Sequence, residues 1–189
     1  MDYVRIGSSG VKVSRICLGS LTFGREANES MCFRILDRFR EEGGNFIDTS
    51  NIYGMGASEE IIGRWLKKRG LRDDTVLATK VYQTTGPGPN DSGLSRLHIQ
   101  RAVKASLRRL QTDVIDLYQI HWWDPNTPVE ETLGALDDLV RQNTVRYLGC
   151  SNIAACQTSK YLRVADRHNW SRFISVQPCY NALNRSIES

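Results

Sequence analysis

Four polar residues have the chemical types needed to protonate a carbonyl oxygen as it becomes an alkoxide. Asp48, Lys80 and His121 each follow a short apolar run, and Tyr53 lies shortly after Asp48. A tyrosine hydroxyl is a poor acid near neutral pH, because its ordinary pKa is about 10, but a nearby ammonium favours the phenolate. We expect Lys80 to supply that ammonium and an ionised Asp48 to orient it.

His121 has two possible tasks in such a site. It would either donate a hydrogen bond to the carbonyl oxygen or help to transfer the proton. Taken singly, the four residues have more ordinary interpretations: a turn cap for Asp48, packing for Tyr53, a surface charge for Lys80 and a structural role for His121. Their joint placement after successive apolar runs favours the chemical interpretation.

The segments that must position these residues alternate between strands and helices. Turn residues between two short alternating runs predict a hairpin over residues 3–13, and six later apolar runs predict strands at residues 16–19, 45–47, 75–79, 114–120, 145–149 and 173–176. Helical periodicity fills the intervening segments, with Ser58 expected as the N-cap of one helix. Strands that alternate with helices indicate right-handed crossovers and a parallel sheet.

A doubly wound sheet and a (β/α) barrel both satisfy this pattern. Five successive strands end in a polar residue, namely Asp48, Lys80, His121, Ser151-Asn152 and Gln177. In a barrel these ends form one ring at the carboxyl face, whereas in an open sheet they are spread along a line. Neither a Gly-x-Gly-x-x-Gly nor a Gly-x-x-x-x-Gly-Lys-[Ser/Thr] motif occurs. We therefore predict an α/β fold of the (β/α)8 TIM-barrel type.

The motifs that contain these residues resemble those of the aldo-keto reductase family. They are, in order, Asn-Phe-Ile-Asp-Thr-Ser-Asn-Ile-Tyr-Gly at 45–54, Thr-Lys-Val at 79–81, Asp-Leu-Tyr-Gln-Ile-His at 116–121, Gly-Cys-Ser-Asn at 149–152 and Ser-Val-Gln at 175–177. The resemblance covers residues 1 to about 185. It implies a barrel closed at its bottom by an N-terminal hairpin, and reduction of aldehydes or ketones to alcohols with a nicotinamide cofactor, usually NADPH and alternatively NADH.

The same resemblance assigns roles to individual residues. It makes Tyr53 the general acid, Asp48 and Lys80 the groups that tune it, and His121 the group that orients the carbonyl. The residues that match nicotinamide-holding positions are Ser151, Asn152, Gln177 and Asp48. Without the resemblance, Ser151-Asn152 is equally typical of a helix N-cap.

Two features near His121 and Lys80 are candidates for substrate recognition. Trp122 and Trp123 directly follow His121, and we expect them either to wall an apolar substrate pocket or simply to pack in a loop. The turn-rich loop over residues 83–93 is expected at the same carboxyl face, either as a pocket rim or as a mobile connector.

Chain length is the main departure from the family pattern. A complete barrel needs eight strands and about 250 residues, whereas six strands are predicted within these 189 residues. We interpret residues 1–189 as a single aldo-keto reductase-like barrel domain that is C-terminally incomplete, truncated after the sixth strand. The resemblance places the aromatic that stacks on nicotinamide, and the basic residues that hold the adenosine phosphate, in the missing part. This hypothesis predicts little activity alone and self-association through open sheet edges.

Composition narrows the class of protein further. The 25 Lys and Arg residues and 21 Asp and Glu residues give a net charge of +4 without a basic run, so nucleic-acid binding is not predicted. No secretory signal and no apolar run of about 18 residues are found, so no membrane span is predicted. Five cysteines without a Cys-x-x-Cys pair are expected to be buried and reduced in the cytoplasm. No metal ligands are assigned, and His98 and His168 are expected on the surface.

Two other functions remain open from the sequence. One is a non-catalytic or inactive regulatory subunit that uses the barrel as a scaffold, resembling the beta subunits of potassium channels. The other is an aldolase-like barrel in which Lys80 forms a Schiff base, since lysines at strand ends also do this.

Overall fold

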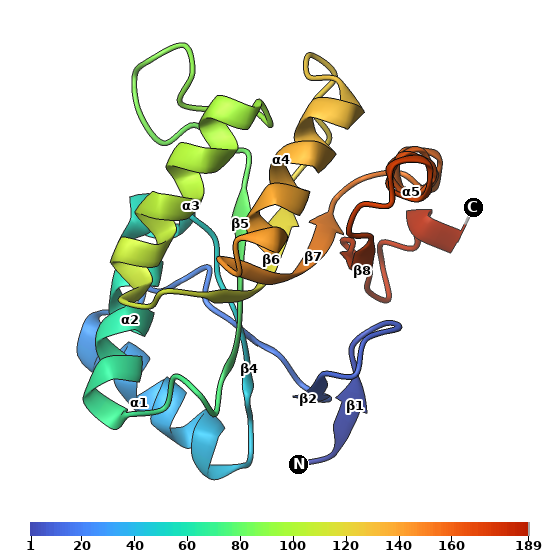
Figure 1. Ribbon diagram of the computed structural model, residues 1–189. Coiled ribbons are helices and arrows are strands. Elements are labelled where there is room, and N and C mark those ends of the chain that lie inside the picture. The colour runs from blue at the N-terminus through green and yellow to red at the C-terminus, as the bar shows by residue number, and fades with distance from the viewer. Residues whose placement is uncertain (189) are drawn as a thin grey trace.

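The computed structural model describes residues 1–188, which form a curled parallel sheet with helices along one side (Figure 1). Each strand pairs with the next one in the sequence, in the order β3-β4-β5-β6-β7-β8. The strands are β3 (Leu18–Gly19), β4 (Phe46–Asp48), β5 (Val76–Val81), β6 (Ile115–Ile120), β7 (Val145–Ser151) and β8 (Phe173–Gln177). This order is that of a (β/α) barrel. The predicted fold class is therefore confirmed, in the form of a half-barrel whose β3 and β8 edges have no strand partner within residues 1–188.

Within residues 1–188, five α-helices connect and cover the strands. They are α1 (Glu29–Glu41), α2 (Ala57–Arg69), α3 (Arg96–Leu110), α4 (Val129–Arg141) and α5 (Ala155–His168). The core lies between these helices and the sheet, and its buried side chains include Trp65, Leu77, Ile99, Leu136 and Tyr161. No helix in the described part of the chain has both the length and the apolar character of a membrane span.

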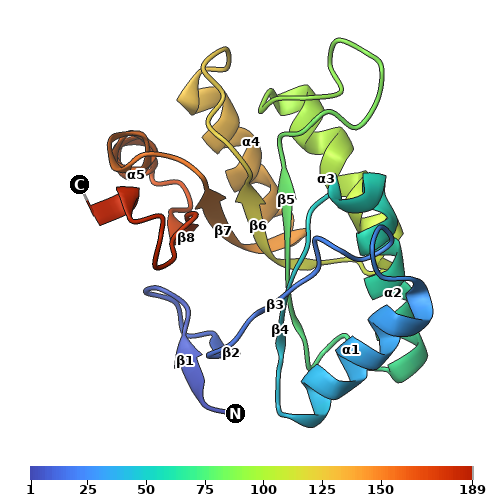
Figure 2. The same cartoon turned by 180° about the vertical axis from the view of Figure 1, so that it is seen from behind.

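The predicted hairpin forms from β1 (Tyr3–Arg5) and β2 (Lys12–Ser14), and it lies on the side of the sheet opposite to α1–α4 (Figure 2). Asn45, just before β4, accepts a hydrogen bond from Ser14 N at 2.6 Å and donates one to Lys12 O at 3.2 Å. A Cβ atom at Gly7 would stand only 1.8 Å from Ile174 O, so the hairpin turn also packs tightly on β8. The hairpin is thus attached to the amino ends of the strands.

The start of α2 differs from the prediction. Ser58 is not the N-cap, because Gly56 occupies that position with φ 99° and the helix begins at Ala57. Ser58 is buried within the first turn, where its hydroxyl lies 2.9 Å from Thr49 Oγ1 and 2.8 Å from Ser20 Oγ. The residue that was expected to cap the start of the helix therefore binds the first turn of α2 to the loops after β3 and β4.

Two further predictions about burial are wrong in part. His98 is only 2% exposed, because it lies on the inward face of α3, where its Nδ1 is 3.1 Å from Asn90 O. Burial lowers the pKa of this imidazole. His168 is exposed, as expected. Of the five cysteines, Cys32 and Cys150 are buried, whereas the exposed ones are Cys17, Cys156 and Cys179.

Candidate active site

The four residues proposed for acid-base chemistry meet at the carboxyl ends of β4, β5 and β6. Lys80 Nζ lies 2.6 Å from Asp48 Oδ2 and 3.3 Å from Tyr53 Oη. The ring of His121 stands edge-on to the ring of Tyr53, with centroids 6.0 Å apart. Lys80 is only 1% exposed, so its interaction with Asp48 takes place away from bulk water, where screening is weak.

The sheet register produces this meeting. Asp48 pairs with Ala78, two residues before Lys80, and Lys80 pairs with Gln119, two residues before His121. Side chains two residues apart in a strand point to the same side of the sheet. Tyr53 reaches the group from a short 3-10 turn, Tyr53–Gly56, which bends sharply because Gly54, Met55 and Gly56 all have positive φ.

The ammonium group of Lys80 has no free donor. It donates to Asp48 Oδ2, to Thr49 O at 2.9 Å and to Tyr53 Oη, which uses all three of its N–H groups. A Schiff-base lysine must instead present a free amine to a carbonyl carbon. The geometry therefore suits a lysine that acts on Tyr53 through charge and hydrogen bonding.

His121 is a neutral side chain at neutral pH. Its pKa is lowered to about 4, first by burial and second by the positive charge of Lys80. Its Nδ1 lies 3.3 Å from Ser50 Oγ, which fixes the orientation of the ring. Because an imidazole with this pKa carries no extra proton at pH 7, hydrogen bonding is the task that it is equipped to perform.

The residues predicted to hold nicotinamide lie beside this group, at the ends of β7 and β8. Ser151 donates to Gln177 O at 2.8 Å, and Asn152 Nδ2 donates to Ser151 Oγ at 2.9 Å and to His121 O at 3.3 Å. Gln177 Nε2 donates to Asp48 Oδ2 at 3.3 Å. The alternative interpretation of Ser151-Asn152 as a helix N-cap is wrong, because α5 begins at Ala155 and its cap is Ala154.

The two tryptophans after His121 have different surroundings. Trp122 is 44% exposed and stacks on His121, with ring centroids 6.3 Å apart. Trp123 instead packs edge-on against the buried ring of Tyr161, at 5.6 Å. The structure therefore places Trp122 next to the four residues and Trp123 in contact with the core.

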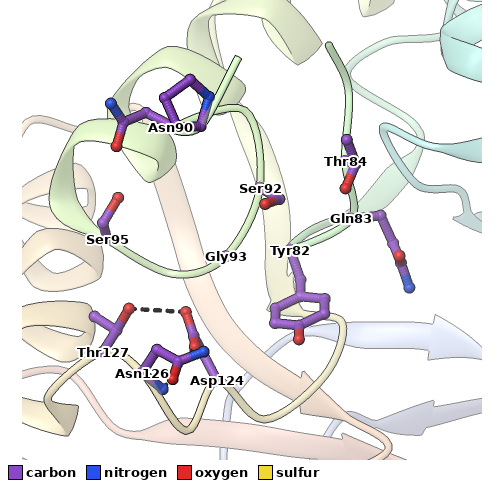
Figure 3. A pocket seen from close by; sticks show the side chains of 11 residues that line it. Tyr82, Gln83, Thr84, Asn90, Ser92, Gly93, Ser95, Asp124, Asn126 and Thr127 are labelled. Atoms are coloured by element: carbon purple, nitrogen blue, oxygen red, sulfur yellow. Dashed lines mark hydrogen bonds between the residues drawn. The ribbon is translucent and has the colours of Figure 1, made fainter. Parts of the chain in front are cut away.

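The loop over residues 83–93 lines a cavity of about 500 Å³ together with the loop after β6 (Figure 3). The carboxylate of Asp124 in this cavity accepts hydrogen bonds from Leu94 N at 2.8 Å, Thr127 Oγ1 at 2.7 Å and Asn126 N at 3.0 Å. The carboxylate oxygens of Asp124 are thus already hydrogen-bonded within the protein. The other residues that line the cavity offer mostly neutral hydroxyl and amide groups. Asp48, Tyr53, Lys80 and His121 do not line this cavity.

Sequence reasoning missed two side chains that support the site. Ser50 contacts His121, as described above, and Gln119 contacts Asp48 at 3.2 Å. The sequence does contain a signal for Gln119, since it is the amide in the otherwise largely apolar second half of the β6 run, Leu-Tyr-Gln-Ile. A buried amide in a central strand needs hydrogen-bond partners, and Gln119 finds them in Asp48 and Gln177 on other strands.

Comparison with known proteins shows which family the chain resembles. A model of the aldo/keto reductase family matches residues 15–189. The chain is 41% identical, over its whole length, to 60% of the uncharacterized oxidoreductase YrpG of Bacillus subtilis. It is 39% identical, over 96% of its length, to 51% of norsolorinic acid reductase B of Aspergillus parasiticus. It is also 39% identical, over 98% of its length, to 57% of a probable voltage-gated potassium channel subunit beta of Arabidopsis thaliana.

The chain spans between half and about three fifths of the length of these three relatives. The family model covers more than nine tenths of the chain, including every strand of the parallel sheet and all four residues that meet around Lys80. The chain belongs to the aldo/keto reductase family.

Proposed function

We propose that the site reduces an aldehyde or ketone to an alcohol, using NADPH or NADH as the hydride donor. The observation that carries this proposal is the contact of Lys80 Nζ with both Asp48 Oδ2 and Tyr53 Oη. The ammonium of Lys80 stands where it can pair with the negative charge that forms on Tyr53 Oη as the hydroxyl proton leaves.

The residues at the strand ends also suit a nicotinamide. A carboxamide offers one acceptor and two donors, and the amides of Gln177 and Asn152 with the hydroxyl of Ser151 offer both kinds of partner. When bound, the reduced nicotinamide supplies a hydride to the carbonyl carbon. NADPH is the expected form of the cofactor by analogy with the family.

The chain's own residues then complete the reduction. As negative charge develops on the carbonyl oxygen, Tyr53 Oη transfers its proton to that oxygen, and the phenolate left behind stays paired with Lys80. Neutral His121 donates a hydrogen bond that holds the oxygen beside Tyr53. Exposed Trp122, stacked on His121, gives an apolar surface for the rest of the substrate.

We further propose a cytoplasmic location. The free cysteines, three of them exposed, are compatible with a reducing compartment.

Two measurements test the proposed function. We expect saturable quenching of tryptophan fluorescence on NADPH titration, followed by slow NADPH-dependent reduction of an aromatic aldehyde. The Tyr53→Phe variant removes the proton donor, so it is expected to lose at least about 100-fold in kcat while it still binds NADPH. Tyr3→Phe is the matched control, because Tyr3 lies in the distant hairpin, where its hydroxyl donates to Gly43 O. Equal turnover by Tyr53→Phe and the wild-type chain would show that Tyr53 is not the acid.

The non-catalytic alternative is not better supported, since the relatives include proteins named as reductases and one named as a channel subunit. The same experiment separates the two functions. NADPH binding without any turnover of carbonyl compounds would favour a scaffold that only senses the cofactor.

A further inference from the structure

Gln119 lies between the acid-base group and the proposed nicotinamide contacts. It projects from the carboxyl-terminal part of β6, one residue before the strand ends, and is only 3% exposed. Its Nε2 donates to Asp48 Oδ1 at 3.2 Å and to Gln177 Oε1 at 3.2 Å. One amide nitrogen thus uses both of its hydrogens to join two residues that come from β4 and β8.

The three side chains form a closed ring of hydrogen bonds. Gln177 Nε2 donates back to Asp48 Oδ2 at 3.3 Å, and the same oxygen accepts from Lys80 Nζ. Asp48 therefore has one oxygen held by Gln119 and the other shared between Gln177 and Lys80. A carboxylate held at both oxygens cannot rotate without breaking a hydrogen bond in a poorly solvated place, which is costly.

Packing around Gln119 restricts its conformation. A Cβ atom at Gly149, its neighbour on β7, would lie 3.2 Å from Gln119 Cγ, so the glycine leaves just enough room for this side chain. Asp48, Gln119 and Gln177 also face one cavity of about 280 Å³ inside the curled sheet. The ring is therefore built into the interior of the half-barrel.

We infer that Gln119 is a positioning residue. It fixes the carboxylate of Asp48, and through it the ammonium of Lys80, while it also sets which way the amide of Gln177 faces. This inference rests on the proposed function for its kinetic consequence, but the orientation of Asp48 and Gln177 is a property of the protein without cofactor.

Gln119→Met tests the inference by removing the donor at nearly constant side-chain shape. We expect kcat at saturating NADPH to fall about tenfold, because a buried hydrogen bond to a charged group is lost. Leu117→Met is the matched control, since Leu117 lies on the same face of β6, two residues earlier, and makes no polar contact. This control is expected to stay within about twofold of the wild-type kcat. Equal kcat values for the two variants would overturn the inference.

Gln119→Glu separates positioning from packing. A protonated carboxyl group can donate to Asp48 as the amide does, whereas an ionised one repels it, so the rate relative to wild type is expected to recover as the pH is lowered. If Gln119 only filled space, the ratio of the Gln119→Glu rate to the wild-type rate would not depend on pH. A constant ratio between pH 5 and pH 8 would count against the inference.

A measurement without turnover keeps the two proposals distinguishable. In a ¹H–¹⁵N spectrum of the cofactor-free chain, we expect Gln119→Met to shift the side-chain amide signals of Gln177 and Leu117→Met to leave them in place. If the wild-type chain reduces no carbonyl but these signals shift, the proposed function fails and the positioning role stands. If no turnover occurs and the Gln177 signals do not move, both proposals fail.

Discussion

The burial of His121 beside Lys80 matters for stability as well as for chemistry. The imidazole pKa is about 4 in the folded protein and 6.5 for an ordinary histidine. Between these two values the unfolded chain binds a proton that the folded chain does not bind. The free energy of unfolding therefore falls as the pH is lowered through this window, and it is unaffected by His121 above it.

This difference gives a prediction at the scale of one residue. His121→Gln removes the titrating group. Between pH 7 and pH 4, the free energy of unfolding is therefore expected to fall less in this variant than in the wild-type chain, with a difference of at most about 3 kcal/mol. Urea unfolding at pH 7 and pH 4 measures the effect. His168→Gln, at an exposed position of α5, is the control. Identical acid sensitivity in wild type and His121→Gln would contradict the assigned cause.

The residue scale also shows what the sequence predicts well. Asp48, Lys80 and His121 were identified because they end apolar runs, and parallel strands bring such ends together. The surroundings of Trp123 and His98 were not predictable in this way. Whether a residue beside the site turns toward it or toward the core depends on loop geometry and on the packing partner, such as Tyr161 for Trp123.

At the scale of elements, the close contact between α2 and α3 depends on a glycine. A Cβ atom at Gly63 would stand 2.4 Å from Arg109 O and 2.7 Å from Leu110 C, both backbone atoms of α3. Nothing in either helix can move aside alone, so an added methyl group must separate the helices.

Gly63→Ala is therefore expected to destabilise the protein, although alanine favours helices more than glycine does. The helix preference of alanine contributes about 1 kcal/mol, and the clash is expected to exceed it, giving a net loss of about 1–2 kcal/mol. Thermal and urea unfolding measure this loss. Gly10→Ala serves as the control, because a Cβ atom there meets nothing within 4 Å. An unchanged or raised melting temperature in Gly63→Ala would disprove the close contact.

The order of the elements was predictable, but some of their ends were not. The spacing of apolar residues and the position of turn residues predict all six parallel strands and the hairpin. The start of α2 was missed because Ser58 has the residue type of a cap, while the turn is actually made by positive φ values at residues 54–56. Backbone conformation of this kind leaves little trace in a pattern of polar and apolar residues.

At the scale of the whole molecule, the half-barrel has two unpaired edges, at β3 and β8, within the described residues. Val176 in β8 is 52% exposed, and Ile16 just before β3 is exposed too. Unpaired strand edges with apolar side chains favour pairing with another chain.

We therefore expect the purified chain to self-associate as its concentration rises. Val176→Lys places a charge on the β8 edge and is expected to shift the equilibrium toward the monomer, as measured by size-exclusion chromatography with light scattering. Leu97→Lys is the control, because it adds the same charge at an exposed apolar position of α3. Equal association of the two variants, or a monomeric wild-type chain at all concentrations, would contradict this expectation.

The tight contact of Gly7 with Ile174 has a consequence for the order of folding during synthesis. The hairpin leaves the ribosome well before β8, because the β8 backbone that covers its turn is made about 170 residues later. At about 5–20 residues per second, that interval lasts roughly 10–30 s. During this time the hairpin has residues 43–45 as partners but not β8, so its docking is completed only after β8 has been made.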